Sequence, residues 1–338
     1  MKADVIVGLQ HGDEGKGKVS LCLSKDQKYT LCLRYNGGPN AGHTIYKNDK
    51  KIVLHQIPCG ILQGLPSIIG SGCVIDLVKL SIEIEELKNI GLDVDKLLKI
   101  SDNAHIITKN HIEDDMKNDT IGSTSSGIRP VNRDKYDRIG KRIMDIPKNE
   151  LEKYIGNVEI INTVLYIQKN DGYILCEGAQ GFELDIDHGN YPFVTSTHCC
   201  SGFVFNSGIA PNRIKEIYGV CKIYSTYIGN MQFQPDNDEN LDYLGVLGNE
   251  FGSTTSRKRQ CNWLNIDRLK TSIYVNGVTT LIINKCDIII ELGIYKLISN
   301  NKIIQVESWI DMMDLITKEL SNYIEPGNIL FSYNKDYI

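Results

Sequence analysis

Hydrophobic and polar positions follow two periods along the chain, and these predict strands interleaved with helices. A short apolar run rich in β-branched residues at 3–9 predicts a buried strand. Residues 76–90 place apolar side chains at helical spacing with acidic residues between them, and predict an amphipathic helix that stops at Gly91. Strands that alternate with helices favour an α/β fold, with a largely parallel central sheet flanked by helices. We also expect strands at 29–35, 51–58, 67–75, 172–176, 213–224, 279–283 and 328–332, and helices at 149–169, 264–274 and 308–323.

The segment 110–135 departs from this pattern. It is polar and rich in Asp, Asn and Ser, which predicts a functional loop rather than a helix or strand. We find no internal repeat, no low-complexity tract and no clear linker in the sequence. These observations predict a single domain over residues 1–338.

Composition narrows the class of protein. A net charge of −5 argues against a general nucleic-acid surface, which needs clustered basic residues. No apolar run reaches the roughly 18 residues that span a bilayer, and the N-terminus resembles no secretory signal, so we expect no membrane contact. The ten cysteines are scattered, mostly in apolar runs, and no CxxC occurs. Buried reduced thiols of a cytoplasmic protein are therefore expected.

The first predicted strand runs into a glycine-rich turn, residues 12–18 (GDEGKGK). Glycines allow the backbone to take positive φ and to approach a ligand closely. Main-chain N–H groups at a helix start, with two lysines beside them, suit a polyphosphate. The spacing fits GxxxxGK, but Val19 stands where a P-loop NTPase has Ser or Thr for magnesium. Asp13 is then the nearest group for a metal ion.

A second nucleotide signal, Asn284-Lys285-Cys286-Asp287, follows an apolar run. A carboxylate such as Asp287 accepts from both N1–H and the 2-amino group of guanine, and a lysine stem can cover the ring. A regulatory GTPase is the rival hypothesis. It is disfavoured because Gly12 and Asn284 lie much further apart than in a compact G domain, and because Val19 removes the magnesium hydroxyl.

Several ordered motifs resemble those of the adenylosuccinate synthetase family, in its compact form similar to archaeal and viral members. The resemblance runs from residue 4 to about 290. Its motifs are 10–18 (QHGDEGKGK), 40–44 (NAGHT), 177–181 (EGAQG), 185–189 (DIDHG), 191–196 (YPFVTS), 252–259 (GSTTSRKR) and 284–287 (NKCD).

The resemblance implies an adenylosuccinate synthase, which is a ligase of purine nucleotide biosynthesis on the branch to AMP. This enzyme joins L-aspartate to IMP with GTP hydrolysis, through a 6-phosphoryl-IMP intermediate. It implies that Asp13 is the general base, that His43 acts on the leaving side of GTP, and that Gln180 orients the purine. One Mg²⁺ per active site would be held by Asp13 and the main-chain oxygen of Gly42.

The resemblance also assigns binding residues. For the triphosphate they are Gly12, Glu14, Gly15, Lys16, Gly17, Lys18, Lys285, Asp287 and Ser332. For IMP they are Asn40, Thr124, Arg138, Gln180, Thr195 and Arg257, and for aspartate Thr255, Arg257 and Arg259. A homodimer is implied, with Arg138 donated across the interface.

Three departures from the family pattern keep alternatives open. Residues 122–130 change two glycines and an arginine of the phosphate loop, 225–234 replace the segment near the ribose, and 331–334 replace the guanine-lining loop. A phage-type relative that makes the 2-amino analogue from dGMP, with ATP or GTP, is the close alternative. The retained Asp13 favours IMP. A binding protein that lost catalysis is disfavoured because Asp13, His43 and Gln180 are all present.

Overall fold

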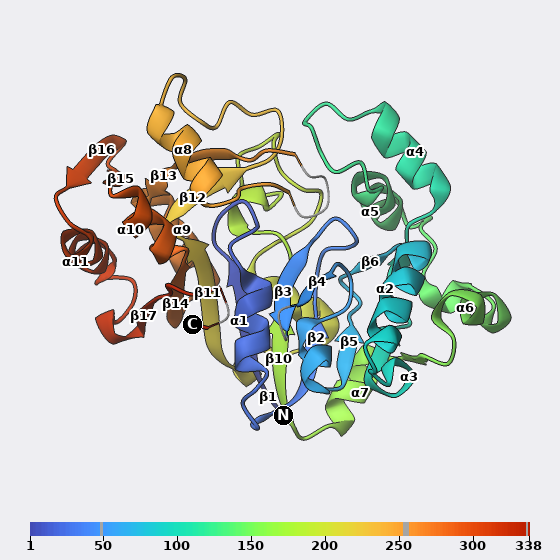
Figure 1. Cartoon of the computed structure of the whole chain (residues 1–338). Coiled ribbons are helices and arrows are strands. Elements are labelled where there is room, and N and C mark those ends of the chain that lie inside the picture. Colours follow the sequence, from blue (N-terminus) through green and yellow to red (C-terminus); the bar gives the residue numbers. More distant parts are fainter. Residues whose placement is uncertain (48–49, 253–256, 336) are drawn as a thin grey trace.

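The computed structural model describes residues 1–47, 50–252, 257–335 and 337–338. A nine-stranded sheet runs through the middle of the molecule (Figure 1), and every neighbouring pair of its strands is parallel. This confirms the predicted α/β fold. The strands in spatial order are β17 (Ile329–Phe331), β14 (Thr280–Asn284), β11 (Ile214–Lys222), β1 (Lys2–Gly8), β10 (Tyr173–Glu177), β2 (Tyr29–Arg34), β5 (Ser67–Ile69), β7 (Leu98–Ser101) and β9 (Glu159–Ile161).

The first strand lies near the centre of this sheet and is covered on both faces. Val5 and Ile6 are fully buried but belong to different hydrophobic clusters, because successive side chains of a strand point to opposite faces. Ile6 shares its cluster with Val19 of α1 (Lys16–Leu23). Burial on both faces explains why β1 reads as an uninterrupted apolar run.

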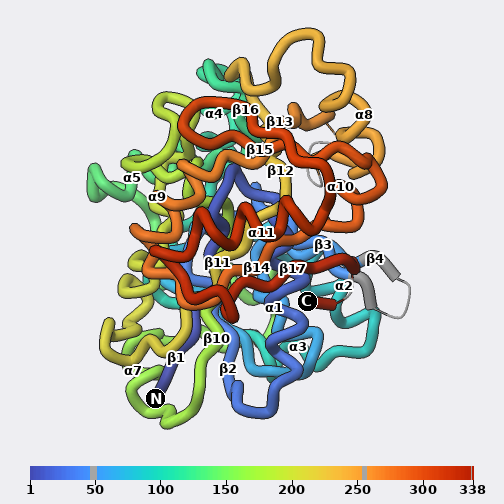
Figure 2. The backbone as a smooth tube through the Cα atoms, turned by 90° about the vertical axis from the view of Figure 1, so that its left-hand side faces the viewer, coloured from blue at the N-terminus to red at the C-terminus, as the bar shows by residue number. Residues whose placement is uncertain are grey.

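Helices surround the sheet and also form the rim above it. Figure 1 shows α4 and α5 on one side of the upper edge of the sheet and α8 on the other. Helix α11, in front in Figure 2, packs on α9 and on the strands β15 and β16. Within the described ranges, no helix is long and apolar enough to cross a membrane. Apart from α1, the described α-helices are α2 (Leu77–Asn89), α3 (Val94–Leu97), α4 (Lys109–Lys117), α5 (Ile128–Asp137), α6 (Lys148–Ile155), α7 (Thr163–Lys169), α8 (Glu239–Leu247), α9 (Ile266–Asn276), α10 (Cys286–Leu292) and α11 (Trp309–Leu320).

Three smaller sheets complete the fold. The largest has four strands, in the order β12 (Tyr224–Tyr227), β13 (Gln260–Asn265), β15 (Tyr295–Ser299) and β16 (Lys302–Val306). A hairpin of β3 (His43–Lys47) and β4 (Lys50–Leu54) places His43 opposite Leu54. The short strands β6 (Val74–Ile75) and β8 (His105–Ile106) pair in parallel.

Two sequence-based expectations about helices were wrong. The segment 110–135, expected to be a loop, contains most of α4 and α5, and α4 begins at a capping box between Thr108 and His111. The expected helix at 149–169 is α6, β9 and α7, because Gly156 takes φ 61° and ends the first helix.

Three expected strands were also longer than the structure has them. The strand at 67–75 is interrupted over residues 70–73, which separate β5 from β6. The strand at 213–224 is β11, which ends at Lys222, and β12 begins at Tyr224. The strand at 51–58 is β4, which ends at Leu54.

The carboxyl ends of the parallel strands meet at one edge of the central sheet, the upper edge in Figure 1. The glycine-rich turn follows β1, the segment to His43 follows β2, Gln180 follows β10, and Lys285 follows β14. In open α/β sheets, this edge is where ligands bind. The topology therefore assembles these predicted site residues from four distant parts of the chain.

Candidate active site

The glycine-rich turn between β1 and α1 is held by its own acidic residue. Gly12, Asp13 and Gly15 take φ of 87°, 60° and 90°, so the backbone here is left-handed at three positions. Glu14 is almost fully buried, and its Oε1 accepts from the main-chain N–H of Gln10 (3.1 Å) and of Gly12 (2.9 Å). Its Oε2 pairs with Lys16 Nζ at 2.5 Å. The Glu14 carboxylate therefore shapes the turn.

Asp13 projects from this turn toward a row of buried charges. Its Oδ2 lies 2.9 Å from Arg259 Nη2, and its side chain is 30% exposed. Arg259 Nη1 also donates to Glu250, whose carboxylate is in turn bound by Lys222 Nζ at 3.2 Å. Burial alone would raise the pKa of Glu250, but the charges of Lys222 and Arg259 outweigh it and lower that pKa to about 2. Glu250 thus stays ionised and holds Arg259 against Asp13.

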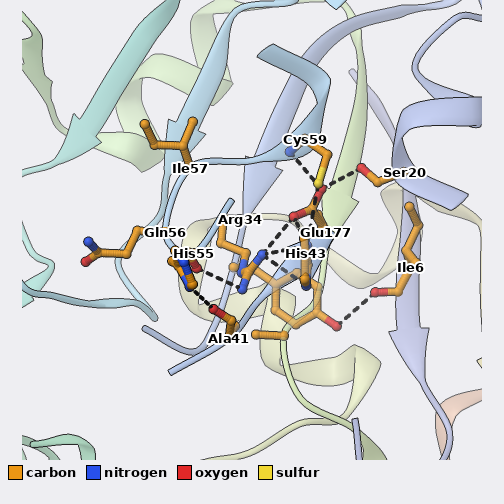
Figure 3. Close-up of polar contacts among 12 residues, drawn as sticks. Ile6, Ser20, Arg34, Ala41, His43, His55, Gln56, Ile57, Cys59 and Glu177 are labelled. Carbon is orange, nitrogen blue, oxygen red and sulfur yellow. Dashed lines mark hydrogen bonds and ion pairs between the residues drawn. The ribbon is translucent and has the colours of Figure 1, made fainter. Parts of the chain in front are cut away.

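His43 lies at the other side of the turn, against a second buried network (Figure 3). Its Nδ1 is 2.7 Å from Glu177 Oε1, and the same oxygen accepts from Arg34 Nη1 at 2.7 Å. The other oxygen of Glu177 accepts from Ser20 Oγ (2.5 Å) and from the main-chain N–H of Cys59 (2.9 Å). Burial and the charge of Arg34 lower the pKa of His43 to about 4, although Glu177 opposes them. The ring is therefore neutral and is held through Nδ1.

The spacing of the glycines reflects close packing around His43. A Cβ on Gly17 would lie 2.9 Å from His43 Cβ, so only glycine lets α1 approach the start of β3 this closely. The first N–H groups of α1 lack partners inside the helix, as at any helix start. Next to Lys16 and Lys18, they form a suitable place for an anion.

Gln180 follows β10 in a left-handed conformation, φ 61°. Its Nε2 donates to Thr195 Oγ1 at 2.8 Å, which joins two predicted IMP residues. Asn40 Oδ1 is buried without a hydrogen-bond partner. A buried polar atom of this kind is unusual in native proteins and indicates that a ligand or water completes its hydrogen bonding.

The predicted guanine segment also braces the phosphate turn. Asn284 Nδ2 donates to the main-chain oxygen of Glu14 at 2.6 Å, while its Oδ1 is buried and unpartnered. Lys285 takes φ 66° and donates to the main-chain oxygen of Gly248, and Asp287 is exposed at the start of α10. Lys18 Nζ donates to Ser332 Oγ at 2.7 Å, so the C-terminal segment closes over this end.

A single cavity of about 860 Å³ joins these parts. It is lined by Gly12, Asp13, Glu14, Gly15, Lys16, Gly17, Lys18, Asn40, Gly42, His43, Thr124, Gln180, Thr195, Arg257, Arg259, Lys285 and Asp287 among others. Ligand pockets usually measure about 300–1,000 Å³. Size and lining together suit a large polar ligand, or two ligands side by side.

Three predicted residues are not part of this lining. Ser332 contacts the cavity only through Lys18. Arg138 caps the C-terminus of α5 and is exposed, with the exposed apolar side chains of Tyr136 and Ile139 beside it. Thr255 lies outside the described residues. Within one chain, then, the structure does not bring Arg138 to the other IMP residues.

Magnesium can be tested against the donors that the structure provides. Asp13 offers a partly exposed carboxylate, and Gly42 a main-chain oxygen, on the same cavity as the glycine-rich turn. Mg²⁺ prefers oxygen ligands and usually takes one or two carboxylates together with substrate phosphates. The donor set therefore fits Mg²⁺.

Sequence reasoning missed the groups behind the site residues. Glu177, Arg34, Lys222 and Glu250 were assigned no role, yet each is at most 1% exposed and charged. A charged residue inside an apolar strand is the signal that was present for Arg34 in β2 and Lys222 in β11.

The chain is similar to known proteins of one family. The family model described as adenylosuccinate synthetase matches residues 5–167 and 148–305. The adenylosuccinate synthetase of Chlorobium phaeobacteroides is 41% identical over 335 residues, covering 85% of this chain and 77% of that protein. The Bacteroides fragilis enzyme of the same name is 40% identical over 334 residues, covering 86% and 78%.

Two solved structures are also similar. The fully ligated adenylosuccinate synthetase from Plasmodium falciparum superposes with a TM-score of 0.87 at 27% identity, covering 99% of this chain and 98% of that one. The succinoaminodeoxyadenylate synthetase of cyanophage S-2L, bound to dGMP and dATP, has a TM-score of 0.78 at 19% identity, covering 99% and 93%. The latter likeness concerns the fold alone.

Proposed function

The chain belongs to the adenylosuccinate synthetase family, a family of ligases that form a C–N bond, and we propose that it joins L-aspartate to IMP with hydrolysis of GTP. The overall reaction converts IMP, L-aspartate and GTP into adenylosuccinate, GDP and phosphate. Membership of a ligase family leaves no reason to propose a regulatory GTPase or a binding protein without catalysis.

One observation carries this proposal. Asp13 and His43, from different strand ends, line the same cavity as the phosphate turn and the Asn284–Asp287 segment. A base, an imidazole and a polyphosphate site in one cavity are what phosphoryl transfer onto a purine oxygen requires.

The chemistry begins at the purine ring. The C6 oxygen of hypoxanthine is a poor leaving group, so it must be phosphorylated before an amine can displace it. Asp13 takes the N1 proton, which makes O6 nucleophilic toward the γ-phosphorus of GTP. The bond from the γ-phosphorus to the bridging oxygen breaks and GDP leaves. The amine of aspartate then attacks C6, and phosphate departs.

His43 serves the leaving side of the triphosphate. Glu177 holds the ring by accepting from Nδ1–H, and Nε2, once protonated, is the nitrogen that donates to the phosphate oxygens. A carboxylate behind an imidazole orients the ring and stabilises positive charge on it, as in hydrolase triads. Gln180, whose Nε2 donates to Thr195 Oγ1, bonds O6 in this proposal and orients it toward Asp13.

Binding groups divide the cavity into three regions. The glycine-rich turn and the start of α1, with Lys16 and Lys18, take the triphosphate, and Lys285, Asp287 and the Ser332 segment take guanine. Asn40, Thr124, Thr195 and Arg257 take the IMP phosphate together with Gln180. Arg257 and Arg259, with Thr255, take the carboxylates of aspartate, for which paired guanidinium groups are well suited.

Magnesium completes the triphosphate region. We assign one Mg²⁺ per active site to Asp13 and the Gly42 main-chain oxygen. When bound, it neutralises charge on the phosphates and supplies Lewis-acid polarisation.

The assay that tests the substrates is a matrix of IMP, dIMP and dGMP against GTP and ATP, with Mg²⁺ and L-aspartate. We expect aspartate-dependent product with IMP and GTP. The readout is product by chromatography and phosphate release. Turnover with dGMP alone, or with ATP in place of GTP, would overturn the assignment of substrates.

We further propose a homodimer in which Arg138 reaches the IMP site of the partner subunit. This accounts for its distance from the cavity of its own chain and for the exposed Tyr136 (66%) and Ile139 (71%) beside it. Mixing inactive Asp13→Ala and Arg138→Ala proteins should then restore roughly a quarter of the activity, because half of the dimers are mixed and each has one intact site. No recovery after confirmed subunit exchange would place Arg138 in its own site.

Two broader assignments follow. We propose that residues 1–338 form one domain, because the central sheet takes strands from β1 to β17 and cannot be divided without breaking it. We propose a cytoplasmic location, because none of the described cysteines forms a disulfide, as expected in a reducing compartment.

A further inference from the structure

The segment from Asp185 to Cys200 brings five metal-ligating side chains together beside the active-site cavity. Two overlapping groups have ligand atoms within 4.8 Å of one another, and Asp185 belongs to both. One group is Asp185, His188 and Cys200, and the other is Asp185, Asp187 and His198. The sequence alone did not indicate this convergence, because the ligands have no standard zinc-binding spacing.

The ligand atoms already point at one another. Cys200 Sγ lies 3.3 Å from Asp185 Oδ2. His198 Nδ1 lies 3.6 Å from Asp185 Oδ1 and 3.7 Å from Asp187 Oδ2. Separations of this order are those between neighbouring ligands of one small cation, given metal–ligand bonds of about 2.0–2.3 Å.

Asp185 differs from the other deeply buried carboxylates in its partners. Five described carboxylate residues are at most 1% exposed: Asp4, Glu14, Glu177, Asp185 and Glu250. The other four each pair with a lysine or arginine at 2.5–3.2 Å. Among the described residues, Asp185 has no lysine or arginine within ion-pairing distance, and faces His198 instead.

Main-chain N–H groups hold the Asp185 carboxylate in place. Its Oδ1 accepts from Asp187 at 3.0 Å and from His188 at 3.3 Å, and its Oδ2 accepts from Cys199 at 2.5 Å. The carboxylates of Asp185 and Asp187 therefore concentrate negative charge in this segment. The described side chains around these two carboxylates are His and Cys rather than Lys or Arg. A cation would complete this arrangement.

A third group of possible metal ligands lies at His43, but a cationic side chain already occupies it. His43, Cys59 and Glu177 also meet the distance condition, but Arg34 Nη1 already occupies the position of a cation, 2.7 Å from Glu177. No guanidinium or ammonium plays that part at Asp185 in the described structure.

We propose that Asp185, His188 and Cys200 bind a borderline divalent cation of the Zn²⁺ type, with His198 as the nearest further ligand. Mixed sulfur, nitrogen and oxygen ligands select Zn²⁺ or Co²⁺ over Mg²⁺ and Ca²⁺, which take oxygen. The bond from the metal to Cys200 sulfur forms as the thiol proton is released to solvent. This site is separate from the magnesium site at Asp13.

Binding of the cation would also restrict a residue of the catalytic cavity, Thr195. Thr195 lies between the ligands in sequence, and it bonds Gln180. A cation that links Asp185 to Cys200 would close a loop around Thr195 and restrict it. We therefore expect the metal to raise the melting temperature and to change the KM for the purine monophosphate more than the KM for the triphosphate.

The test uses Co²⁺, which reports thiolate ligation by absorption. Metal-free full-length protein, with Mg²⁺ in excess, should bind one Co²⁺ and develop a near-ultraviolet thiolate-to-metal band. Cys200→Ser should abolish that band, and His188→Gln should raise the dissociation constant at least about tenfold. The matched control is Cys199→Ser, the adjacent and buried thiol, which should keep the band. Circular dichroism and ligase activity verify that each variant is folded.

Two results would overturn the proposal. One is the absence of saturable Co²⁺ binding to the wild-type protein. The other is a thiolate band that survives Cys200→Ser. If that surviving band disappears with Cys59→Ala, the ion is bound at the His43 cluster instead.

Discussion

Replacing Asp13 with alanine should lower the turnover number by about 10²–10⁴-fold, the usual effect of removing a general base. The binding of GTP should fall by much less, through the loss of one Mg²⁺ ligand, because Glu14 and Asn284 hold the phosphate turn without using Asp13. Arg259 loses one partner but remains bound to Glu250, so the site keeps its shape. Turnover with IMP, L-aspartate and GTP, and nucleotide affinity by calorimetry, measure the two effects separately.

The control for this variant is Asp242→Ala. Asp242 is exposed and lies outside the cavity lining, and its side chain pairs with Lys258 and Gln234, which also lie outside that lining, so its loss should leave turnover unchanged. If Asp13→Ala kept wild-type turnover, the base would have to be another group. If it lost GTP binding to the same degree as turnover, its role would be in binding.

The pattern of apolar and polar residues correctly predicted the helices and strands in which that pattern is regular. The apolar run of β1 and the amphipathic residues of α2 agree with the structure to within two residues at each end, because burial on fixed faces determines both patterns. The segments at α4 and α5 have few apolar residues, and only their buried faces and caps stabilise them. Those contacts are formed by the tertiary structure, which composition does not describe.

The sequence predicted the site residues only where the backbone conformation, or a close approach to it, requires a particular residue type such as glycine. Glycines at Gly12 and Gly15 are needed because φ is positive there, and Gly17 is needed because His43 lies against it. The partners of the site residues were not predictable from one sequence. Asp13 meets Arg259, and His43 meets Glu177, through the parallel sheet, which joins strands that are distant in the chain.

Replacing Glu177 with glutamine should lower the turnover number by roughly 10–100-fold, as for other groups that orient a catalytic residue, while KM values change little. Glutamine has the same length, but its NH₂ group cannot accept the hydrogen bonds that Glu177 receives from Arg34, Ser20 and the Cys59 main chain. The charge that orients His43 through Nδ1 is also lost.

Glu177→Gln should also make the protein less stable, and this must be distinguished from its effect on the orientation of His43. Arg34 becomes an uncompensated buried charge in Glu177→Gln, which costs about 3–5 kcal/mol in the free energy of unfolding. Ser20→Ala is the matched control, because it removes one hydrogen bond from the same carboxylate without touching His43, and it should retain near-normal turnover.

The decisive readout for Glu177 is the histidine ring itself. In the wild-type protein, nitrogen NMR should show the proton of His43 on Nδ1, facing Glu177, and in Glu177→Gln that preference should weaken. A purely structural role for Glu177 predicts the opposite combination: unfolding at lower temperature, an unchanged ring signal, and normal turnover per folded molecule. A carboxylate that only stabilises the core has no means of changing which nitrogen of His43 carries the proton, so these measurements separate the two roles even where both variants are less stable.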